Sequence, residues 1–419
     1  MPIRRTEFDS GLRVVTERMP GVRSVAFSLW VLAGSRDEPP PISGSSHFLE
    51  HLLFKGTKTR TAKDIADAFD AVGGELNAFT AKEYTCYYAR VLDRDLPMAV
   101  EHLSDMLQRS VIRTADFDSE KQVILEEINV HEDTPDDLIH DLFTETLWAD
   151  HPLGRPILGT RKSIVAAGRD QVRRFYKKHY VPGNVVVVAA GSVEHQTLLS
   201  MLGEHMGTGR IRSEGPSAWN MREAGNPPAP SGRSDVKRRK TEQAHICIGT
   251  NGVSRHDPDR FALGIVNVAL GGGMSSRLFQ EIREKRGLVY SVYSYQTMYA
   301  EAGLFCAYAG TTPNRAQEVI DLMRRELSDV AEKGLTPEEF ERAKGHMKGS
   351  LVLSQEDPGG RMSRLGKSEI SHGEILTLGQ MLRRIDAVTL KDARRVAERV
   401  LSQPMSLTVL GPFSKGAIA

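Results

Sequence analysis

The amino-acid sequence predicts an α+β protein built from two homologous halves, each a β-sheet covered by helices. Strand-like apolar runs alternate with amphipathic helical patterns along the chain. Three segments also recur at offsets of 219 to 221 residues: 35–39 as 254–258, 185–191 as 406–411, and 172–174 as 393–395. Because three nearly equal offsets are unlikely to arise by chance, they indicate an internal repeat.

A segment rich in proline, glycine and serine separates the two copies. Residues 211–234 have the composition of a linker. The sequence therefore predicts a first half at residues 1–210 and a second half at residues 235–419.

The elements of the first half follow from local patterns. The expected strands are residues 14–15, 25–31, 76–81, 84–89 and 185–191. The expected helices are residues 44–54, 61–70, 119–128 and one that opens at 132–137, with Pro135 in its first turn. A loop at residues 34–41 leads into the first of these helices.

Composition excludes several classes of protein. The 55 basic and 54 acidic residues give a net charge of +1, which argues against nucleic acid or an anionic membrane as partner. Cys86, Cys247 and Cys306 are widely spaced, which argues against a disulfide framework or a thiolate metal site. The sequence has neither a signal-peptide-like start nor an 18-residue apolar segment, so we expect a cytoplasmic protein.

Residues 44–54 predict a short, largely buried helix that carries candidate metal ligands. Ser45 or Ser46 is expected to cap its start. His47 and His51 lie one turn apart on one face, and Glu50 lies about 60° to the side. Two such imidazoles can share a zinc ion while the carboxylate takes a proton from a zinc-bound water. The order His-x-x-Glu-His is the inverted zinc-protease motif, although two helix histidines bonded to neighbours would give the same pattern.

A catalytic zinc site needs a third protein ligand and an open position. Residues 119–128 predict an amphipathic helix in which Glu120 and Glu127 share a face while Glu126 points elsewhere.

With these residues in view, the sequence resembles the pitrilysin, insulysin and mitochondrial processing peptidase family, and in particular its short prokaryotic members. The resemblance implies that Glu127, which lies 76 residues beyond His51, is the third zinc ligand. It implies that Glu120 supports the site without ligating, the alternative being a solvated surface carboxylate. It also implies an exposed edge strand on which substrate lies, where an ordinary hairpin is the alternative. The residues of that strand are Asn77, Ala78, Phe79 and Thr80.

The second half lacks the zinc motif. At the repeat offset, the motif positions fall on Val266, Ala269 and Leu270. A glycine-rich loop at residues 271–273 feeds a helix, and it does not complete a phosphate-binding pattern. Arg283 and Tyr290 match the family pair that contacts bound peptide, and both can donate hydrogen bonds to a developing oxyanion.

The resemblance implies a zinc metalloendopeptidase that hydrolyses unfolded peptides in an enclosed chamber, with one Zn²⁺ per chain. Two halves make half of a clamshell, so the chain is expected to pair, as a homodimer or with a related subunit. The alternatives are a non-catalytic peptide-binding or scaffold subunit and a presequence-type processing peptidase.

Overall fold

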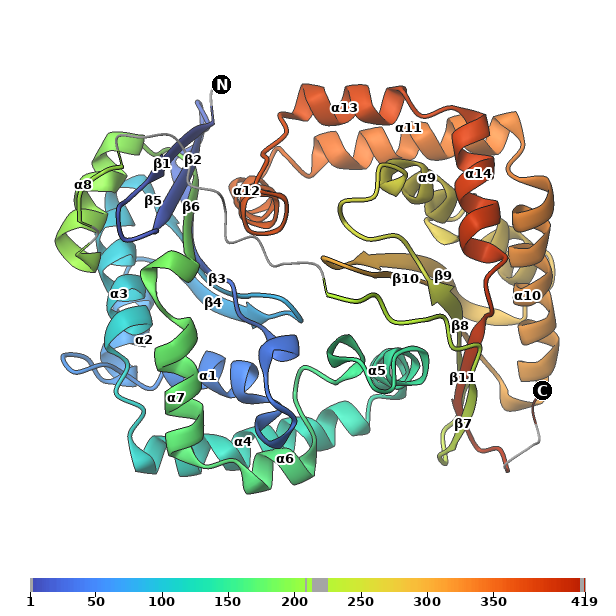
Figure 1. Ribbon diagram of the computed structural model, residues 1–419, viewed down its shortest axis with the longest axis horizontal. Helices are drawn as coiled ribbons and strands as arrows, with labels where there is room; N and C mark the ends of the chain where they lie inside the picture. Colours follow the sequence, from blue (N-terminus) through green and yellow to red (C-terminus); the bar gives the residue numbers. More distant parts are fainter. Residues whose placement is uncertain (1–2, 208, 213–224, 415–417, 419) are drawn as a thin grey trace. The chain divides into compact units, whose positions relative to one another are not determined.

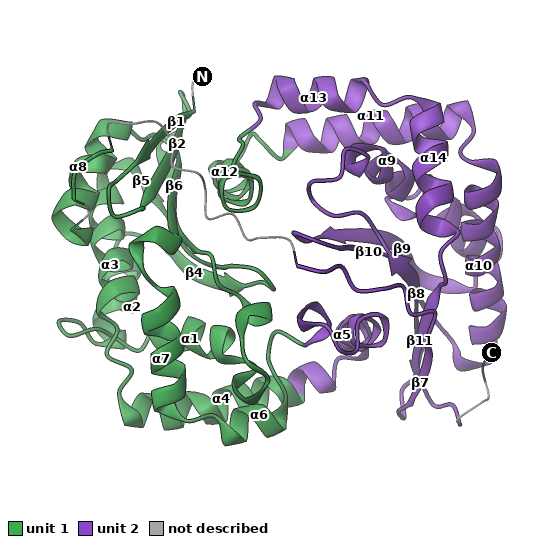
Figure 2. Ribbon diagram, in the orientation of Figure 1, with its two compact units in different colours: residues 1–129, 156–221, 354–375 green, residues 130–155, 222–353, 376–419 purple. Residues whose placement is uncertain are grey.

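The computed structural model describes residues 3–207, 209–212, 225–414 and 418, and it forms two compact units (Figures 1 and 2). Unit 1 comprises residues 1–129, 156–221 and 354–375, and unit 2 comprises residues 130–155, 222–353 and 376–419. These units do not coincide with residues 1–210 and 235–419, because each contains a helix from the other half of the sequence. Residues 213–224 of the expected linker lie outside the described residues.

Unit 1 contains a six-stranded sheet in the order β1-β2-β6-β3-β5-β4. Its strands are β1 (Arg4–Glu7), β2 (Arg13–Arg18), β3 (Ser24–Val31), β4 (Glu75–Thr80), β5 (Thr85–Leu92) and β6 (Val185–Gly191). β2 and β6 run parallel, and the other neighbours are antiparallel. All seven residues of β6 are buried, which explains why its sequence is an unbroken run of apolar residues and glycine. β4 is an edge strand.

Helices cover both faces of this sheet. The helices of unit 1 are α1 (Ser45–Leu53), α2 (Ala62–Asp70), α3 (Leu96–Arg109), α4 (Thr114–Glu132, which ends in unit 2), α6 (Arg161–Ala166), α7 (Arg169–His179), α8 (His195–Met206) and α12 (Pro358–His372). On one face, Phe27 and Leu29 of β3 join a core with Phe48 of α1 and Leu103 of α3. α12 lies on the other face.

α12 packs closely on the sheet of unit 1. Its residues Met362, Leu365 and Ile370 form a core with Trp30 and Val186. A Cβ added at Gly366 would lie 2.1 Å from the Trp30 ring, so the helix can approach this closely only with glycine there.

Charged pairs add to this packing. The carboxylate of Glu17 accepts hydrogen bonds from Arg361 at 2.8 Å and Arg364 at 2.7 Å, and Glu369 accepts one from Arg5 at 3.0 Å. The buried Glu17 and Glu369 are thus paired, which offsets the cost of taking a carboxylate out of water.

Unit 2 repeats this arrangement around a five-stranded sheet in the order β7-β11-β8-β10-β9. Its strands are β7 (Ser234–Arg238), β8 (Ala244–Asn251), β9 (Val289–Met298), β10 (Gly303–Thr311) and β11 (Ser406–Gly411). Its helices are α5 (Pro135–Leu147), α9 (Arg260–Gly271), α10 (Ala316–Lys333), α11 (Pro337–Leu353), α13 (Leu378–Asp386) and α14 (Leu390–Leu401). Helices α9, α10 and α14 share a core with one face of the sheet, while α5 packs on the other.

Apart from β1, which has no counterpart in the second sheet, the two sheets have equivalent topology. β7 and β11 are parallel, as β2 and β6 are, and the remaining pairs are antiparallel in both. α9 takes the place of α1, and α5 takes the place of α12. The predicted α+β fold of two equivalent halves is confirmed, and the halves exchange one helix each: α5 covers the second sheet and α12 covers the first (Figure 2).

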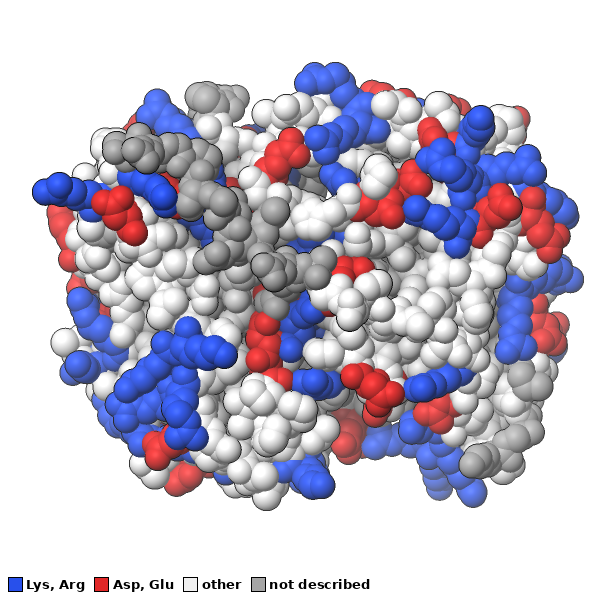
Figure 3. Space-filling view, in the orientation of Figure 1, with Lys and Arg blue, Asp and Glu red and all other residues white. Residues whose placement is uncertain are grey.

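The surface carries both signs of charge. On the face in Figure 3, groups of Lys and Arg side chains and groups of Asp and Glu side chains are scattered among uncharged residues, in keeping with the net charge of +1. In the described part of the chain, no helix has the length and apolar character needed to cross a membrane.

Candidate active site

α1 carries the three side chains of the zinc motif beside a buried apolar face. Phe48, Leu49, Leu52 and Leu53 are fully buried in the core of unit 1. His47 and His51 lie one turn apart, with ring centroids 4.7 Å from each other. The helical spacing expected from the sequence therefore brings these two imidazoles together.

The start of α1 differs from the prediction. Ser45 and Ser46 lie inside the first turn and neither caps the helix, so the expected serine cap is wrong; the N-cap is Gly44 at φ 96°. The carboxylate of Glu38 instead accepts hydrogen bonds from the backbone N–H groups of Gly44 and Ser46, each at 2.6 Å. Burial raises the pKa of Glu38 to about 7, even though these backbone donors act in the opposite direction.

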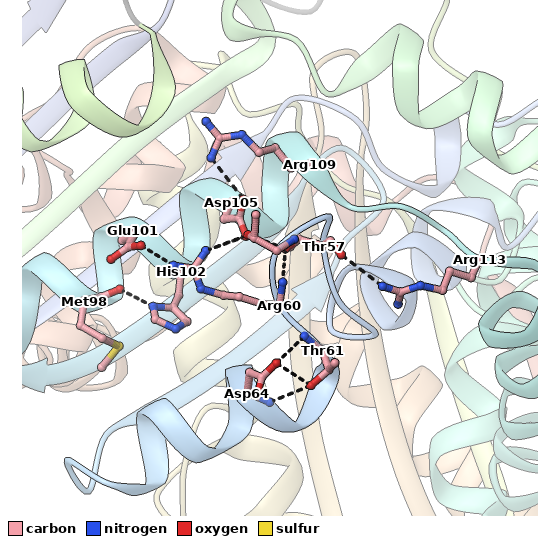
Figure 4. Close-up of polar contacts among 11 residues, drawn as sticks. Thr57, Arg60, Thr61, Asp64, Met98, Glu101, His102, Asp105, Arg109 and Arg113 are labelled. Carbon is pink, nitrogen blue, oxygen red and sulfur yellow. Dashed lines mark hydrogen bonds and ion pairs between the residues drawn. The ribbon is translucent and has the colours of Figure 1, made fainter.

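A polar network holds the loop that follows α1 (Figure 4). Asp105 of α3 is 1% exposed and accepts hydrogen bonds from Thr57 at 2.6 Å, Arg60 at 2.8 Å and Arg109 at 3.2 Å. Burial alone would raise the pKa of Asp105, but these donors outweigh it and hold the pKa below its usual value. α1 is thus anchored at both ends.

α4 brings Glu127 to the two histidines. The Phe117 ring near its start stacks on Phe48 of α1 with centroids 4.5 Å apart. One Glu127 oxygen lies 3.5 Å from His47 Nε2, and the other lies 3.5 Å from His51 Nε2. Within the described residues this is the one group of three His, Cys, Asp or Glu side chains whose ligand atoms all lie within 4.8 Å of one another.

This donor set fits a zinc ion. Two donors at about 2.1 Å from one tetrahedral ion lie about 3.4 Å apart, close to the spacing found here. Burial, and then the neighbouring His51, lower the pKa of His47 to about 3, so its imidazole is neutral, the form that binds metals. Glu127 Oε2 is buried without a hydrogen-bond partner, as expected of an atom that awaits a cation. Three protein ligands leave a fourth position open.

Glu120 lies behind His51. It is 3% exposed, which rules out a solvated surface carboxylate. One oxygen lies 3.1 Å from His51 Nδ1, and the other lies 2.7 Å from Lys55 Nζ. A carboxylate on Nδ1 presents Nε2 to the metal side of the ring. Glu126 is exposed and accepts a hydrogen bond from Asn129, so it lies outside the group.

Glu50 lies beside the ligands and contacts the edge strand. Burial raises the pKa of its carboxyl, even though the hydrogen bond from Thr80 and the nearby His51 act in the opposite direction. Thr80 Oγ1, at the end of β4, donates a hydrogen bond to Glu50 Oε2 at 2.5 Å.

The segment expected to seat a substrate is the outer strand of the sheet. β4 forms a hairpin with β5, and its other side has no strand neighbour among the described residues. Asn77 is exposed, and the three residues after it are half-buried. An unpaired strand edge of this kind offers backbone N–H and C=O groups to an extended peptide.

In unit 2 the structure brings Arg283 and Tyr290 together. The Arg283 guanidinium lies over the rings of Phe279, at 4.6 Å, and Tyr290, at 5.3 Å. Arg283 belongs to a π-helical turn at Phe279–Glu284, whereas Tyr290 is on β9 and is 79% exposed.

The equivalents of the zinc motif in unit 2 have no ligand atoms. Val266, Ala269 and Leu270 are buried apolar residues of α9.

Sequence reasoning missed three contacts of the site. Glu38 lies in a stretch expected to be a loop, Lys55 follows the motif without a recognised role, and Thr80 was assigned only to the substrate strand. Each of these residues acts through a contact with a part of the chain that tertiary structure brings near. No local sequence pattern predicts such a contact.

Comparison with known proteins agrees with this geometry. Residues 13–161 match the family model described as Insulinase (Peptidase family M16), and residues 166–347 match the one described as Peptidase M16 inactive domain. The second match covers the part of the chain that carries the equivalents of the zinc motif without ligand atoms.

Relatives match over nearly the whole chain. A protein of Streptomyces coelicolor named an uncharacterized zinc protease is 51% identical over 98% of this chain and 90% of its own length. Proteins with the same description from Mycobacterium tuberculosis and Bacillus subtilis are 45% and 38% identical, each over 98% of this chain and over 93% and 98% of their own lengths.

Solved structures share the fold. A structure described as peptidase M16 inactive domain from Pseudomonas fluorescens has a TM-score of 0.89 at 21% identity, covering 99% of this chain and 98% of that one. A protease from Helicobacter pylori has a TM-score of 0.88 at 21% identity, covering 98% of this chain and all of its own. With a family model on each half and relatives that match from end to end, this chain belongs to peptidase family M16, the insulinase family, as its motifs indicated.

Proposed function

We propose that this protein is a zinc metalloendopeptidase that hydrolyses unfolded peptides inside an enclosed chamber. The observation that carries the proposal is the group of His47, His51 and Glu127, whose donor atoms lie within 4.8 Å of one another, with the carboxylate of Glu50 beside them. The relatives named zinc proteases support the same reading.

Each residue has a chemical role in this proposal. His47, His51 and Glu127 hold the zinc, and Glu120 orients His51. A bound zinc ion lowers the pKa of a water molecule and polarises a carbonyl oxygen. Glu50 accepts a proton from the attacking water and delivers it to the nitrogen of the leaving amine.

Two further parts complete the proposal. The backbone of Asn77 to Thr80 pairs with an extended peptide, which explains how one site accepts many sequences. Arg283 and Tyr290 donate hydrogen bonds to the carbonyl oxygen as it gains negative charge. We also propose that two chains pair to enclose the chamber, because the two halves of one chain make only half of a clamshell.

A non-catalytic peptide-binding or scaffold subunit is the competing function. Such a subunit requires neither a complete zinc donor set nor a carboxylate beside it. The presence of both in unit 1 favours the enzyme.

The test is metal analysis of the purified chain together with digestion of a library of unfolded peptides. We expect about one zinc per chain and cleavage that a chelator abolishes. Glu50→Gln should keep zinc and peptide binding but lose turnover, because an amide cannot accept the proton. Glu126→Gln, on the exposed side of α4, serves as the matched control and should behave as wild type. A Glu50→Gln protein that cleaves at a near-normal rate would remove Glu50 as the base.

A further inference from the structure

The hydrogen bond between Thr80 and Glu50 joins two distant parts of the sequence at the candidate active site. Thr80 Oγ1 donates to Glu50 Oε2 at 2.5 Å, across 30 positions of sequence. Thr80 is the last residue of β4, and Glu50 projects from α1. In the described part of the chain, this hydroxyl is the hydrogen-bond partner of the Glu50 carboxylate.

This bond restrains a side chain that is otherwise flexible. The backbone of Glu50 is fixed by α1, which leaves three side-chain torsions to place the carboxylate. The hydrogen bond from Thr80 Oγ1 restricts those torsions. Because it occupies only Oε2, the other oxygen stays open to accept a proton.

The end of β4 that carries Thr80 is itself well anchored. The backbone N–H groups of Ser35 and Arg36 donate to the carbonyl oxygens of Ala81 and Lys82, at 3.2 Å and 2.9 Å. The guanidinium of Arg36 also pairs with Glu83 at 2.5 Å, and both side chains are largely buried.

Close packing adds to this anchor. A Cβ added at Gly34 would lie 2.3 Å from the Ala81 carbonyl oxygen, so the loop before α1 lies directly against the hairpin turn. The loop that leads into α1 therefore also holds the turn that positions Thr80. A hydroxyl on such a supported element can define the position of a partner to within a fraction of an ångström.

We propose that Thr80 is a positioning residue that holds Glu50 in the orientation needed for proton transfer. The proposal rests on the proposed function, in which Glu50 is the general base. It gives β4 a second role: the strand expected to seat the peptide backbone also orients the carboxylate that acts on the scissile bond.

The proposal predicts a defect in turnover. A positioned general base contributes about 10²- to 10⁴-fold to rate, and a misplacement of about 1 Å can remove about 10²-fold. Thr80→Val keeps the shape of the side chain and removes the hydroxyl. We expect it to lower kcat by about 10- to 100-fold with KM within about threefold of wild type, because the backbone of β4 is unchanged.

Two variants serve as comparisons in the full-length protein. Thr80→Ser keeps the hydroxyl and should restore most of kcat. Thr297→Val makes the same substitution at a half-buried position on β9, the edge strand of the other sheet, and should leave kcat unchanged. Zinc content and thermal midpoint should match wild type in all three.

A second readout does not depend on activity. Crystal structures of the metal-free proteins should show the Glu50 carboxylate rotated away from the end of β4 in Thr80→Val and in its wild-type position in Thr80→Ser. If Thr80→Val does not fold, Thr80→Ala removes the hydroxyl with less bulk and replaces it in both measurements.

The outcomes separate this proposal from the proposed function. A Thr80→Val protein with kcat within twofold of wild type, or with Glu50 unmoved in the crystal, overturns the positioning role. Loss of zinc from a folded Thr80→Val protein also overturns it, since Thr80 would then act on the ligands. If wild-type protein neither binds zinc nor cleaves peptides, the proposed function fails, and the crystal structures still decide whether Thr80 orients Glu50.

Discussion

Glu120 and Glu127 lie seven residues apart on one face of α4, yet their surroundings differ. Glu120 is buried, and both its oxygens contact cationic or N–H partners, His51 and Lys55. The Glu127 side chain is 40% exposed, and its Oε2 has no hydrogen-bond partner. The first carboxylate is satisfied by the protein, whereas the second keeps an oxygen available to coordinate the proposed zinc ion.

This difference predicts unequal effects of substitution on zinc affinity. Glu127→Gln should abolish stable zinc binding, because it replaces an anionic ligand. Glu120→Gln should weaken zinc about 10- to 100-fold, as the loss of a partner behind a histidine ligand does elsewhere. Competition with a chelator of known affinity measures both, with Glu126→Gln as the unaffected control. Zinc loss in Glu126→Gln but not in Glu127→Gln would contradict the assignment of the ligands.

Asp105 predicts a pH dependence of stability. Its donors hold its folded-state pKa below the ordinary value of 3.8. Its contribution is therefore fully present above the unfolded-state pKa and is lost as pH falls through the folded-state pKa. Asp105→Asn should destabilise the protein by about 1–3 kcal/mol at pH 7, because buried donors lose a charged acceptor.

Urea unfolding at pH 7 and at successively lower pH measures this effect. The difference between wild type and Asp105→Asn should be constant down to about pH 5 and should shrink below about pH 4. Asp118→Asn, at an exposed position on α4, should change little at any pH. A difference that grows on acidification would show that the carboxylate of Asp105 is not stabilising in its ionised form.

At the scale of elements, the sequence predicts those helices and strands whose formation depends on the spacing of their own apolar residues. Residues 185–191 and 25–31 form strands because buried apolar runs of that length fit a sheet covered on both faces. Residues 45–53, within the predicted 44–54, form a helix because their apolar spacing matches its period. The cap of α1 is different: Glu38 reaches it from six residues upstream, so a cap rule based on adjacent serines fails. Likewise, the charged stretch before Val289 gives no sign that a strand begins there and carries Tyr290.

The close packing of α12 against Trp30 predicts the effect of adding one methyl group at Gly366. Gly366→Ala would place Cβ 2.1 Å from the ring of Trp30, which is fully buried and donates a hydrogen bond to Ser28. We expect a loss of about 1–3 kcal/mol, because neither the ring nor the helix can move freely. Gly345→Ala in α11, where the added Cβ meets nothing within 4 Å, should instead stabilise by about 0.5–1 kcal/mol.

Urea unfolding of the two alanine variants and wild type measures these effects. The expected changes in the free energy of unfolding have opposite signs. This distinguishes the steric clash of Gly366→Ala from the gain in helix propensity of Gly345→Ala. A Gly366→Ala protein as stable as wild type would mean that α12 has room to shift.

At the scale of the whole molecule, the sequence predicts the internal repeat but not the exchange of helices between the two halves. α5 begins at residue 135 and α12 at residue 358, an offset of 223 that is close to the 219 to 221 of the repeat and identifies the two helices as equivalents. An amphipathic helix, however, has an apolar stripe that suits either sheet, and nothing in residues 135–147 or 358–372 indicates which sheet it covers. That choice depends on chain connections and on partners such as Glu17 and Trp30, which lie more than 300 positions from α12.

The exchange predicts the behaviour of the separated halves. A fragment of residues 1–212 contains α5 but lacks α12, and a fragment of residues 225–419 has the reverse deficit. Each should be poorly soluble and should lack a cooperative unfolding transition, because the apolar residues on one face of its sheet lack the helix that covers them. Co-expression should restore a soluble, zinc-binding complex, which circular dichroism, size-exclusion chromatography and metal analysis detect.

Cleavage of the folded chain within residues 213–224 provides the control for that experiment. The two pieces should stay together, because each still holds the helix that the other needs. A soluble, cooperatively folding 1–212 fragment with full zinc occupancy would contradict the importance of the exchange.

Because α12 lies late in the sequence, it also affects how the first sheet folds during synthesis on the ribosome. The strands of the first sheet are all made by residue 191, but α12, which covers the face around Trp30, ends at residue 372. At about 5–20 residues per second, the ribosome needs on the order of 10 seconds or more to synthesise the residues between 191 and 372. Until then, that face of the sheet lacks the helix that covers it. During each round of synthesis the nascent chain therefore presents an apolar surface that chaperones can bind, and slower translation of the second half lengthens that exposure.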